Sequence, residues 1–215
     1  MRNNTPTIIA AILLCLLMIL PAALRAQPPE QTGTAAAGAT AAVQGTLDSI
    51  LTVLLDADLK KQNPAKRMQT VQALFRQRFD ESTFCTRALG RYWKERSQQE
   101  RDEFVRLFSD LLVSTYLERI DGYLSANASF TKNDITYRGE RQAKNYTLVT
   151  TDVKINQTTS IPVLYRMEQI NGDWKVTDIA IEGISLLQNY RAQFNEIIAN
   201  AGYEELIKRL NDKKV

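Results

Sequence analysis

The sequence predicts an α+β domain in which helices pack on one face of a curved antiparallel sheet of about four strands. Three observations support this. Apolar residues recur every three or four positions through the first half of the chain, as in amphipathic helices. They alternate with polar residues in the second half, as in half-buried strands, and helical spacing returns near the C-terminus. This order of elements is typical of an α+β layout around one core.

The first 26 residues have the features of a secretory signal peptide. Arg2 gives the positive start, and residues 8–20 form an apolar run of about 13 residues. That length suits a signal peptide and is shorter than the roughly 20 residues needed to span a bilayer. Pro21 ends the run, and Ala26 is a small residue at the expected cleavage point. We therefore expect a periplasmic mature protein, with an uncleaved anchor as the alternative.

Residues 27–45 are rich in Ala, Gly, Thr, Gln and Pro and contain almost no large apolar side chain. Such a segment cannot bury enough apolar surface to offset its conformational entropy, so we expect a disordered leader. No further linker interrupts the chain, and the remaining length of about 170 residues fits one domain. The sequence thus predicts a leader over residues 27–45 and a single domain over residues 46–215.

Three helices are expected at the start of this domain. The first spans residues 46–59, and the second begins at Pro64. Asp80 could cap a third helix that ends at Leu89, because Gly90 permits the left-handed backbone that a helix end prefers.

A long helix follows. Ser97 and Glu100 have the spacing of a capping box, so the helix should begin at Gln98. Its apolar stripe is wide enough to contact more than one layer. The residues of the stripe are Phe104, Val105, Phe108, Leu111, Leu112, Val113, Tyr116, Leu117, Ile120 and Tyr123.

Strands of period two occupy the second half. A first strand should end at Ile135 and Tyr137, and a second alternates through Val149, Val153 and Ile155. The third is defined by alternate apolar residues: Ile161, Val163, Tyr165 and Met167. Asn171-Gly172 then predicts a tight hairpin, because a type I′ turn needs positive φ at both central residues.

The hairpin fixes a register with Met167 opposite Val176. The alternation of apolar residues in the last strand then shifts by one position, because Val176 has an even residue number and Ile179 and Ile181 have odd ones. A bulge at Thr177-Asp178 would repair the phase, placing Tyr165 opposite Ile179 and Val163 opposite Ile181. Such a bulge bends a sheet, which favours a concave wall.

Two helices should close the chain. Ser185 and Gln188 form a second capping-box pattern, and Gly202 ends the helix that follows. A short final helix carries Tyr203, Leu206, Ile207 and Leu210.

The composition argues against several kinds of site. The chain has no histidine, which removes the commonest general base and metal ligand. After signal cleavage Cys85 is the only cysteine, so it cannot form an internal disulfide and should pack beside Phe84 as a small hydrophobe. Loss of Arg2 and Arg25 leaves a formal charge of +1, too balanced for binding nucleic acid. The chain also lacks a glycine-rich phosphate loop and a nucleophile elbow. We expect no catalytic residue, no metal and no cofactor.

One enzymatic alternative stays open. A pocket with a buried carboxylate could act as a general base, and Asp178 or Glu182 near the last strand could supply it. Solvated carboxylates are ordinary at strand ends, so a purely structural role is the simpler interpretation.

Two segments resemble the MlaC-like, toluene-tolerance family of periplasmic phospholipid-binding proteins. The first is Leu89-Gly90, Trp93, Ser97-x-x-Glu100-Arg101-x-x-Phe104 and Tyr116. The second is Trp174-Lys175-Val176, Asp178, Glu182-Gly183-Ile184-Ser185-Leu186 and Asn189-Tyr190-Arg191-x-x-Phe194. The similarity covers residues 47–210, and the leader is a departure from the family pattern.

The resemblance implies a carrier that is not an enzyme, with phospholipid as its cargo. Acyl tails would lie in an apolar pocket and the headgroup would face solvent. Implied partners are an inner-membrane transporter with a mammalian-cell-entry domain ring and an outer-membrane lipoprotein–porin complex, with the carrier a monomer. A hopanoid or other lipid is the alternative cargo.

Apolar residues on both faces of the long helix and of two strands have two explanations, a sandwiched core or a lined cavity. Periodicity does not separate them. The residues that we expect to line the pocket are Phe104, Phe108, Leu111, Leu112, Val149, Val163, Tyr165, Met167, Ile179, Ile181, Leu187, Tyr190 and Phe194.

Overall fold

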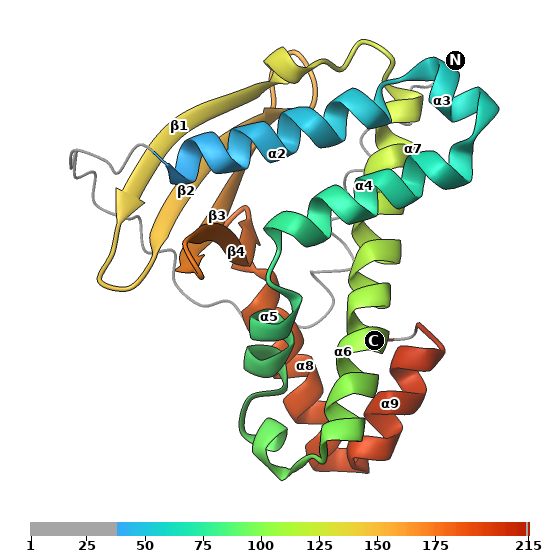
Figure 1. Ribbon diagram of the computed structural model, residues 1–215, viewed down its shortest axis with the longest axis vertical. Helices are drawn as coiled ribbons and strands as arrows, with labels where there is room; N and C mark the ends of the chain where they lie inside the picture. The colour runs from blue at the N-terminus through green and yellow to red at the C-terminus, as the bar shows by residue number, and fades with distance from the viewer. Residues whose placement is uncertain (1–37, 214) are drawn as a thin grey trace. The chain divides into compact units, whose positions relative to one another are not determined.

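The computed structural model describes residues 38–213 and residue 215 (Figure 1). The predicted signal peptide and residues 27–37 of the predicted leader lie outside this part of the chain. The helices before the sheet are α2 (Ala39–Leu54), α3 (Ala57–Gln62), α4 (Pro64–Arg78), α5 (Glu81–Leu89), the 3₁₀ helix η1 (Gly90–Glu95), α6 (Gln98–Leu112), the π-helical segment η2 (Val113–Leu117), α7 (Glu118–Ala126) and the 3₁₀ turn η3 (Lys132–Asp134). Among the described residues, no helix is long and apolar enough to cross a membrane.

The sheet confirms the predicted α+β class. Its strands are β1 (Ile135–Gln142), β2 (Thr147–Lys154), β3 (Ser160–Ile170), β4 (Asp173–Ile181) and β5 (Ile184–Ser185). They pair antiparallel in the order β1-β2-β3-β4-β5, so the sheet has five strands where about four were expected. The fifth is a two-residue strand that leads directly into α8 (Leu186–Ala201), which is followed by α9 (Tyr203–Asn211).

The first described helix begins earlier than predicted. α2 starts at Ala39, so the expectation of disorder to residue 45 was wrong for residues 39–45. Ala39 and Val43 are buried, and the backbone N–H and hydroxyl of Thr40 both donate to Glu140 of β1 at 2.7 Å. A carboxylate at a helix N-terminus satisfies free N–H groups and favours the helix dipole. The start of α2, which has few large apolar side chains, is therefore held in place by Glu140, a residue 100 positions away from Thr40.

The same helix also ends earlier than predicted. α2 stops at Leu54 instead of continuing to residue 59, and α3 begins after Asp56. The Asp56 side chain accepts hydrogen bonds from the backbone N–H groups of Asp58 and Leu59 at 2.9 and 2.8 Å. An aspartate in this position is a strong helix N-cap, so it starts a new helix.

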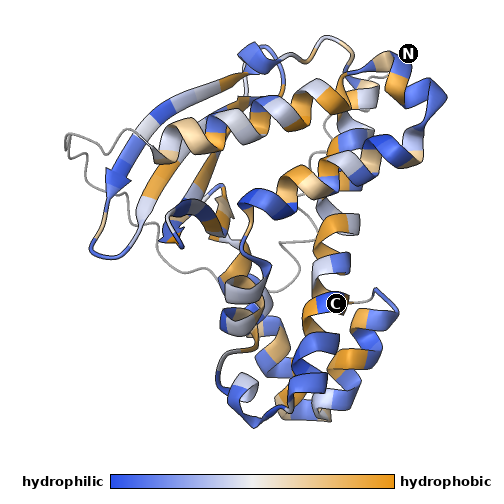
Figure 2. Ribbon diagram, viewed as in Figure 1, coloured by the Kyte–Doolittle hydropathy of each residue, from blue (hydrophilic) through white to orange (hydrophobic). Residues whose placement is uncertain are grey.

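Local capping signals located the starts of α5 and α6 correctly. Both hydrogen bonds of the Ser97–Glu100 capping box are present, and α6 begins at Gln98. The Asp80 side chain accepts from the backbone N–H of Thr83 at 2.9 Å and caps α5. Figure 2 shows apolar and polar bands alternating along α2, α4 and α6, as expected for helices with one buried face.

The long predicted helix contains an unpredicted π-helical turn. α6, η2 and α7 follow one another without a break in helical backbone, because the flanking residues Leu112, Val113 and Glu118 all have right-handed helical φ and ψ. A π turn inserts one residue and widens the helix, and such turns often occur at functional sites. Tyr116 lies within this turn.

The β3–β4 hairpin agrees with its sequence prediction. Asn171 and Gly172 have φ values of 53° and 85°, as a type I′ turn requires. Met167 pairs with Val176, Tyr165 with Ile179, and Val163 with Ile181. By contrast, the first strand begins at Ile135, where it was expected to end.

The predicted bulge is present on β4. Arg166 pairs with Asp178 and Met167 with Val176, which leaves Thr177 as the extra residue. Thr177 is fully buried, and its hydroxyl donates to the Glu168 carboxylate at 2.9 Å. The same carboxylate accepts from Arg87 of α5 at 2.7 and 2.9 Å and from Arg166 at 3.0 Å. The bulge is thus joined to α5 by a charged network.

In the part of the chain that the structure describes, the buried apolar residues form two clusters. The main cluster joins α5, α6, α8 and α9 to the sheet, and includes Cys85, whose thiol pKa burial raises to about 12. Cys85 is fully buried near Phe84, as predicted. The second cluster joins α2, α4, η2 and α7; its buried members are Ile50, Leu51, Leu54, Val71, Val113, Leu117, Leu124 and Phe130.

A buried arginine organises the helices of the second cluster. Arg67 of α4 is 3% exposed, and it donates to the Asp121 carboxylate of α7 at 2.6 Å and to the Val53 carbonyl of α2 at 3.2 Å. It also donates to the carbonyl of Leu54. These bonds satisfy carbonyls at the end of α2 that have no partner within the helix.

Candidate functional site

The inner face of the sheet lies under the helices. α2 contacts β1 and β2, while α4, α5 and α8 contact β4. One row of paired residues crosses four strands: Tyr137, Thr151, Val163 and Ile181. The next row contains Val149, Tyr165 and Ile179, and the row beyond it Thr147, Met167 and Val176. The inner face is therefore mainly apolar, with a few hydroxyl groups among the apolar side chains.

Twelve of the thirteen predicted pocket residues belong to the main cluster. Nine are buried: Phe104, Phe108, Leu111, Leu112, Val149, Tyr165, Met167, Tyr190 and Phe194. Val163, Ile179 and Leu187 are half-buried and pack against these nine. Ile181, at the end of β4, is half-buried and belongs to neither cluster.

Four of these residues form a close aromatic group between α6 and α8. Phe108 lies 4.8 Å from Phe194 and 4.9 Å from Tyr190, measured between ring centroids. Phe104 is 5.6 Å from both Phe108 and Phe194. The tilted and edge-to-face geometries are those that aromatic pairs prefer in packed cores. The structure gives these four rings a packing role between two helices, and contact with a lipid stays a prediction for them.

The second cluster contains apolar residues that the sequence analysis did not assign to the site. Phe75 of α4 packs against both clusters, so the two meet at this side chain. The π turn also spans the junction, because Val113 belongs to the second cluster and Tyr116 packs against the main one. Across the sheet, Ile135 and Val153 belong to the second cluster and Val163 to the main one. We call this boundary the seam.

The apolar stripe predicted for the long helix includes Val113 and Tyr116. Helical spacing alone does not distinguish residues that line a site from residues of the packed core. Ile135 and Tyr137 were expected to end a first strand and were not assigned to the pocket. Their period of two was visible in the sequence, but the polar residues that continue β1 to Gln142 gave no apolar alternation.

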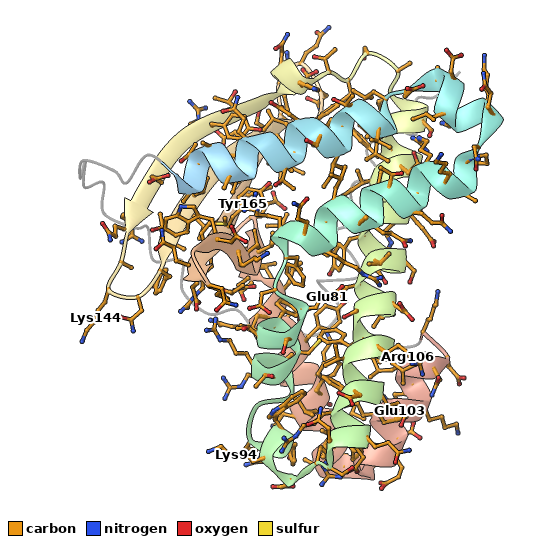
Figure 3. All side chains as sticks on the ribbon, viewed as in Figure 1. Glu81, Lys94, Glu103, Arg106, Lys144 and Tyr165 are labelled. Carbon is orange, nitrogen blue, oxygen red and sulfur yellow. The ribbon has the colours of Figure 1, made fainter. Side chains whose placement is uncertain are left out.

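Three hydroxyl groups lie together on the inner face near the seam. Tyr137 of β1 pairs with Thr151 of β2, and Tyr165 of β3 lies one row further along. Figure 3 shows Tyr165 beneath α2, over the sheet. We call Tyr137, Thr151 and Tyr165 the hydroxyl group cluster.

The environment makes both phenols of this cluster harder to ionise than an ordinary tyrosine. Burial raises the pKa of Tyr137 to about 12, with further increases from the charge of Asp48 on α2 and from Tyr165. Burial also raises the pKa of Tyr165, which the neighbouring Thr151 hydroxyl partly offsets. These groups are therefore neutral near pH 7, where they can donate hydrogen bonds and have little capacity as bases.

Of the two carboxylates considered as possible bases, Asp178 has a structural role and Glu182 is exposed. Asp178 Oδ1 accepts hydrogen bonds from the backbone N–H groups of Ile179 and Leu187, at 2.8 and 3.1 Å. Its Oδ2 accepts from the Ser185 hydroxyl at 2.6 Å, and Ser185 in turn caps α8 through the N–H of Gln188. Glu182 is exposed in the β4–β5 turn, with φ of 52°. Asp178 holds the start of α8, and Glu182 lies outside the buried interior.

A shallow depression lies beside the π turn. It has a volume of about 340 Å³ and is lined by Ser114, Thr115, Glu118, Arg119 and Lys213. Its lining residues are all of polar or charged types and it opens widely to solvent, so it differs from the apolar pocket that the sequence predicts.

Comparisons with known proteins agree on one family. The family model described as MlaC protein matches residues 44–212, which is most of the chain. A curated relative, the intermembrane phospholipid transport system binding protein MlaC of Haemophilus influenzae, is 24% identical over 130 residues. That alignment covers 58% of this chain and 58% of the relative, so the match spans little more than half of that protein's length.

A solved structure extends the similarity to nearly all of the fold. The phospholipid-binding protein of Ralstonia solanacearum, determined in complex with a phospholipid, superimposes with a TM-score of 0.70 and 28% sequence identity. The superposition covers 83% of this chain and 97% of that one.

Proposed function

Because this chain belongs to the MlaC protein family, we propose that it binds a phospholipid by its acyl tails between the sheet and the helices. The observation that carries this proposal is the seam. It is an apolar boundary that runs from Phe75 and the π turn to Val163 on the inner face of the sheet. The phospholipid bound to the Ralstonia solanacearum protein, whose fold is similar, supports the same ligand class.

The seam is the place where tails can enter at the lowest cost. Insertion into the close aromatic group would separate rings about 5 Å apart and lose their contacts. Insertion between two clusters leaves the packing within each cluster intact. The helix at this boundary also contains the π turn Val113–Leu117, and turns of this kind occur frequently at functional sites.

The energetics require a carrier of this kind. Burial of each methylene group is worth about 0.8 kcal/mol, so two acyl chains in water would cost on the order of 20 kcal/mol. Lipid diffusion through water is then negligible. An interior lined by Val, Ile, Leu and Met side chains resembles the bilayer interior, which keeps exchange with a membrane close to balanced. Such transfer needs no catalytic group.

We further propose that the protein acts in the periplasm, with the headgroup exposed, and moves lipid between the outer and inner membranes. The name of the Haemophilus influenzae relative, which describes intermembrane phospholipid transport, supports this setting. The proposed partners are the inner-membrane transporter with a mammalian-cell-entry domain ring and the outer-membrane lipoprotein–porin complex.

Lipid uptake by arginine variants tests the position of the tails. Val163→Arg introduces a charge into the seam on β3, and Leu112→Arg introduces one on α6 next to the π turn. The matched controls are Gln169→Arg and Glu103→Arg, at exposed positions on the same two elements. Each protein is incubated with phosphatidylethanolamine vesicles and re-isolated, and its bound lipid is quantified.

We expect Val163→Arg and Leu112→Arg to lose most of their lipid uptake while the controls match the wild type. The reason is that an unpaired charge in an apolar interior is costly and recruits water. Circular dichroism establishes that each variant is folded. Full loading of a folded Val163→Arg variant would contradict the proposed position of the tails.

A further inference from the structure

The hydroxyl of Tyr137 is buried and makes no hydrogen bond to the residues that the structure describes. Its oxygen is inaccessible to solvent. Buried polar groups in proteins are nearly always hydrogen-bonded, and an exception calls for an explanation such as a ligand or a water. A phenylalanine would fill the same space without the cost of desolvating a hydroxyl. The hydroxyl therefore points to a binding partner outside the protein chain.

The position of Tyr137 connects this hydroxyl with the proposed lipid site. It pairs with Thr151, which pairs with Val163 on the seam, and it packs against the main cluster. The phenol of Tyr165 is near enough to influence its ionisation. Donors are thus concentrated at one spot in an interior that is otherwise apolar.

The charge nearby limits what the partner can be. Asp48 on α2 lies close enough to Tyr137 to act on it electrostatically. A phosphate or fatty-acid carboxylate at this spot would be repelled by the Asp48 carboxylate. A neutral oxygen acceptor would accept the phenolic proton without that penalty. The ester carbonyl, where an acyl tail joins the glycerol backbone, is the neutral acceptor that a phospholipid brings to the edge of an apolar site.

We propose that the hydroxyl of Tyr137, flanked by Thr151 and Tyr165, donates a hydrogen bond to an ester carbonyl of the bound lipid. This subsite would make the protein prefer ester-linked over ether-linked lipids of the same shape, because an ether oxygen is a poorer acceptor and lies at a different position. The inference deepens the proposed function and rests on it.

A competition between two lipids tests the subsite. Vesicles contain equimolar diester and diether phosphatidylethanolamine with the same saturated chain length. The wild-type protein, Tyr137→Phe and the control Tyr203→Phe are incubated with them and re-isolated. Mass spectrometry of the extracted lipid gives the diester-to-diether ratio. Tyr203 suits the control because its hydroxyl already donates to the Glu100 carbonyl at 3.0 Å, between α9 and α6.

We expect the wild type and Tyr203→Phe to take up the diester in roughly fivefold excess, the effect of one hydrogen bond. Tyr137→Phe should bind both lipids with a ratio near one. A wild-type ratio near one, as expected if the hydroxyl holds only a water molecule, would overturn the subsite. A preference that persists in Tyr137→Phe would overturn it as well.

The same experiment separates this inference from the proposed function. If the wild type takes up neither lipid, the proposed function fails together with the subsite. If it takes up both equally, only the subsite fails. The thermal melting of lipid-free Tyr137→Phe gives a second readout: we expect a melting temperature equal to or above that of the wild type. A clear decrease would mean that the hydroxyl stabilises the protein itself, which would overturn the subsite.

Discussion

The guanidinium of Arg87 on α5 donates two hydrogen bonds to the Glu168 carboxylate on β3, at 2.7 and 2.9 Å. The Glu168 side chain is 16% exposed, and the same carboxylate accepts from Thr177 at the β4 bulge. The pair therefore links the bend of the sheet to the helices that cover it. Bidentate pairs of this kind are stronger than ordinary surface ion pairs.

Removal of this link should destabilise the protein. We expect Arg87→Met to lower the free energy of unfolding by about 1–2 kcal/mol, an amount discounted because Arg87 is itself partly exposed. Urea unfolding at pH 7 measures the change. Arg76→Met is the matched control, since its ion pairs with Glu81 and Asp110 are more exposed. An equal loss in both variants would contradict a special role for the bidentate pair.

The Glu168 network should also make stability depend on pH. Hydrogen bonds from Arg87 lower the pKa of Glu168 to about 2, with smaller contributions from Thr177 and Arg166. A depressed folded-state pKa means that the unfolded state binds the proton more readily, so acid favours unfolding. The contribution is complete above the ordinary carboxyl pKa of about 4.5 and is lost as the pH falls towards about 2.

The difference in stability between wild type and Glu168→Gln measures this linkage. We expect the difference to be largest near pH 7 and to shrink between about pH 5 and pH 2, as followed by urea unfolding. A difference that stays constant across this range would show that the carboxylate charge is not what stabilises the folded protein.

The stability of the second cluster should depend on the ion pair between the buried Arg67 and Asp121. Asp121→Ala leaves the Arg67 guanidinium buried with carbonyl groups alone, and we expect a loss of about 2–3 kcal/mol of stability. The carboxylate is itself partly exposed, so this value is below that of a fully buried pair. Asp110→Ala, at an exposed position of α6, serves as the control for urea unfolding. A similar small effect in both variants would contradict the structural role of the Arg67–Asp121 pair.

Asp178 should act as a structural cap. Asp178→Ala removes acceptors for two backbone N–H groups and for Ser185, and we expect a stability loss of about 1–2 kcal/mol. Lipid uptake should persist below the melting temperature, because the carboxylate lies at the start of α8 instead of in the seam. Unchanged stability together with abolished function would instead favour the alternative in which Asp178 takes part in chemistry.

Local chemistry made part of the fold predictable from the sequence. Asn171-Gly172 determined the hairpin type, and the apolar phase around Thr177 then determined the bulge and the pairing of Tyr165 with Ile179. The Ser97–Glu100 capping box determined the start of α6. In each case, residues close in sequence supply the hydrogen bonds or backbone angles that decide the structure.

Long-range contacts explain most of what could not be predicted. The start of α2 depends on Glu140, which lies on β1 and bonds to Thr40. The π turn changes the helix register without a distinct residue pattern, so the stripe around Val113 predicted a regular helix.

The candidate site was predictable in composition but not in detail. Periodicity identified Phe108 and Val163 equally as inward-facing residues. The structure separates them, with Phe108 in a close aromatic group and Val163 beside the seam. Tyr137 became visible as a site residue only when the position of β1 was known.

The most direct test of the central claim is mass spectrometry of an organic extract from the protein purified without detergent from its native host. We expect phospholipid in a stoichiometric amount. A hopanoid or other polycyclic lipid would contradict phospholipid as the cargo while retaining a lipid carrier. An empty extract, with no uptake from added vesicles, would contradict the carrier function and show that the seam is closed core.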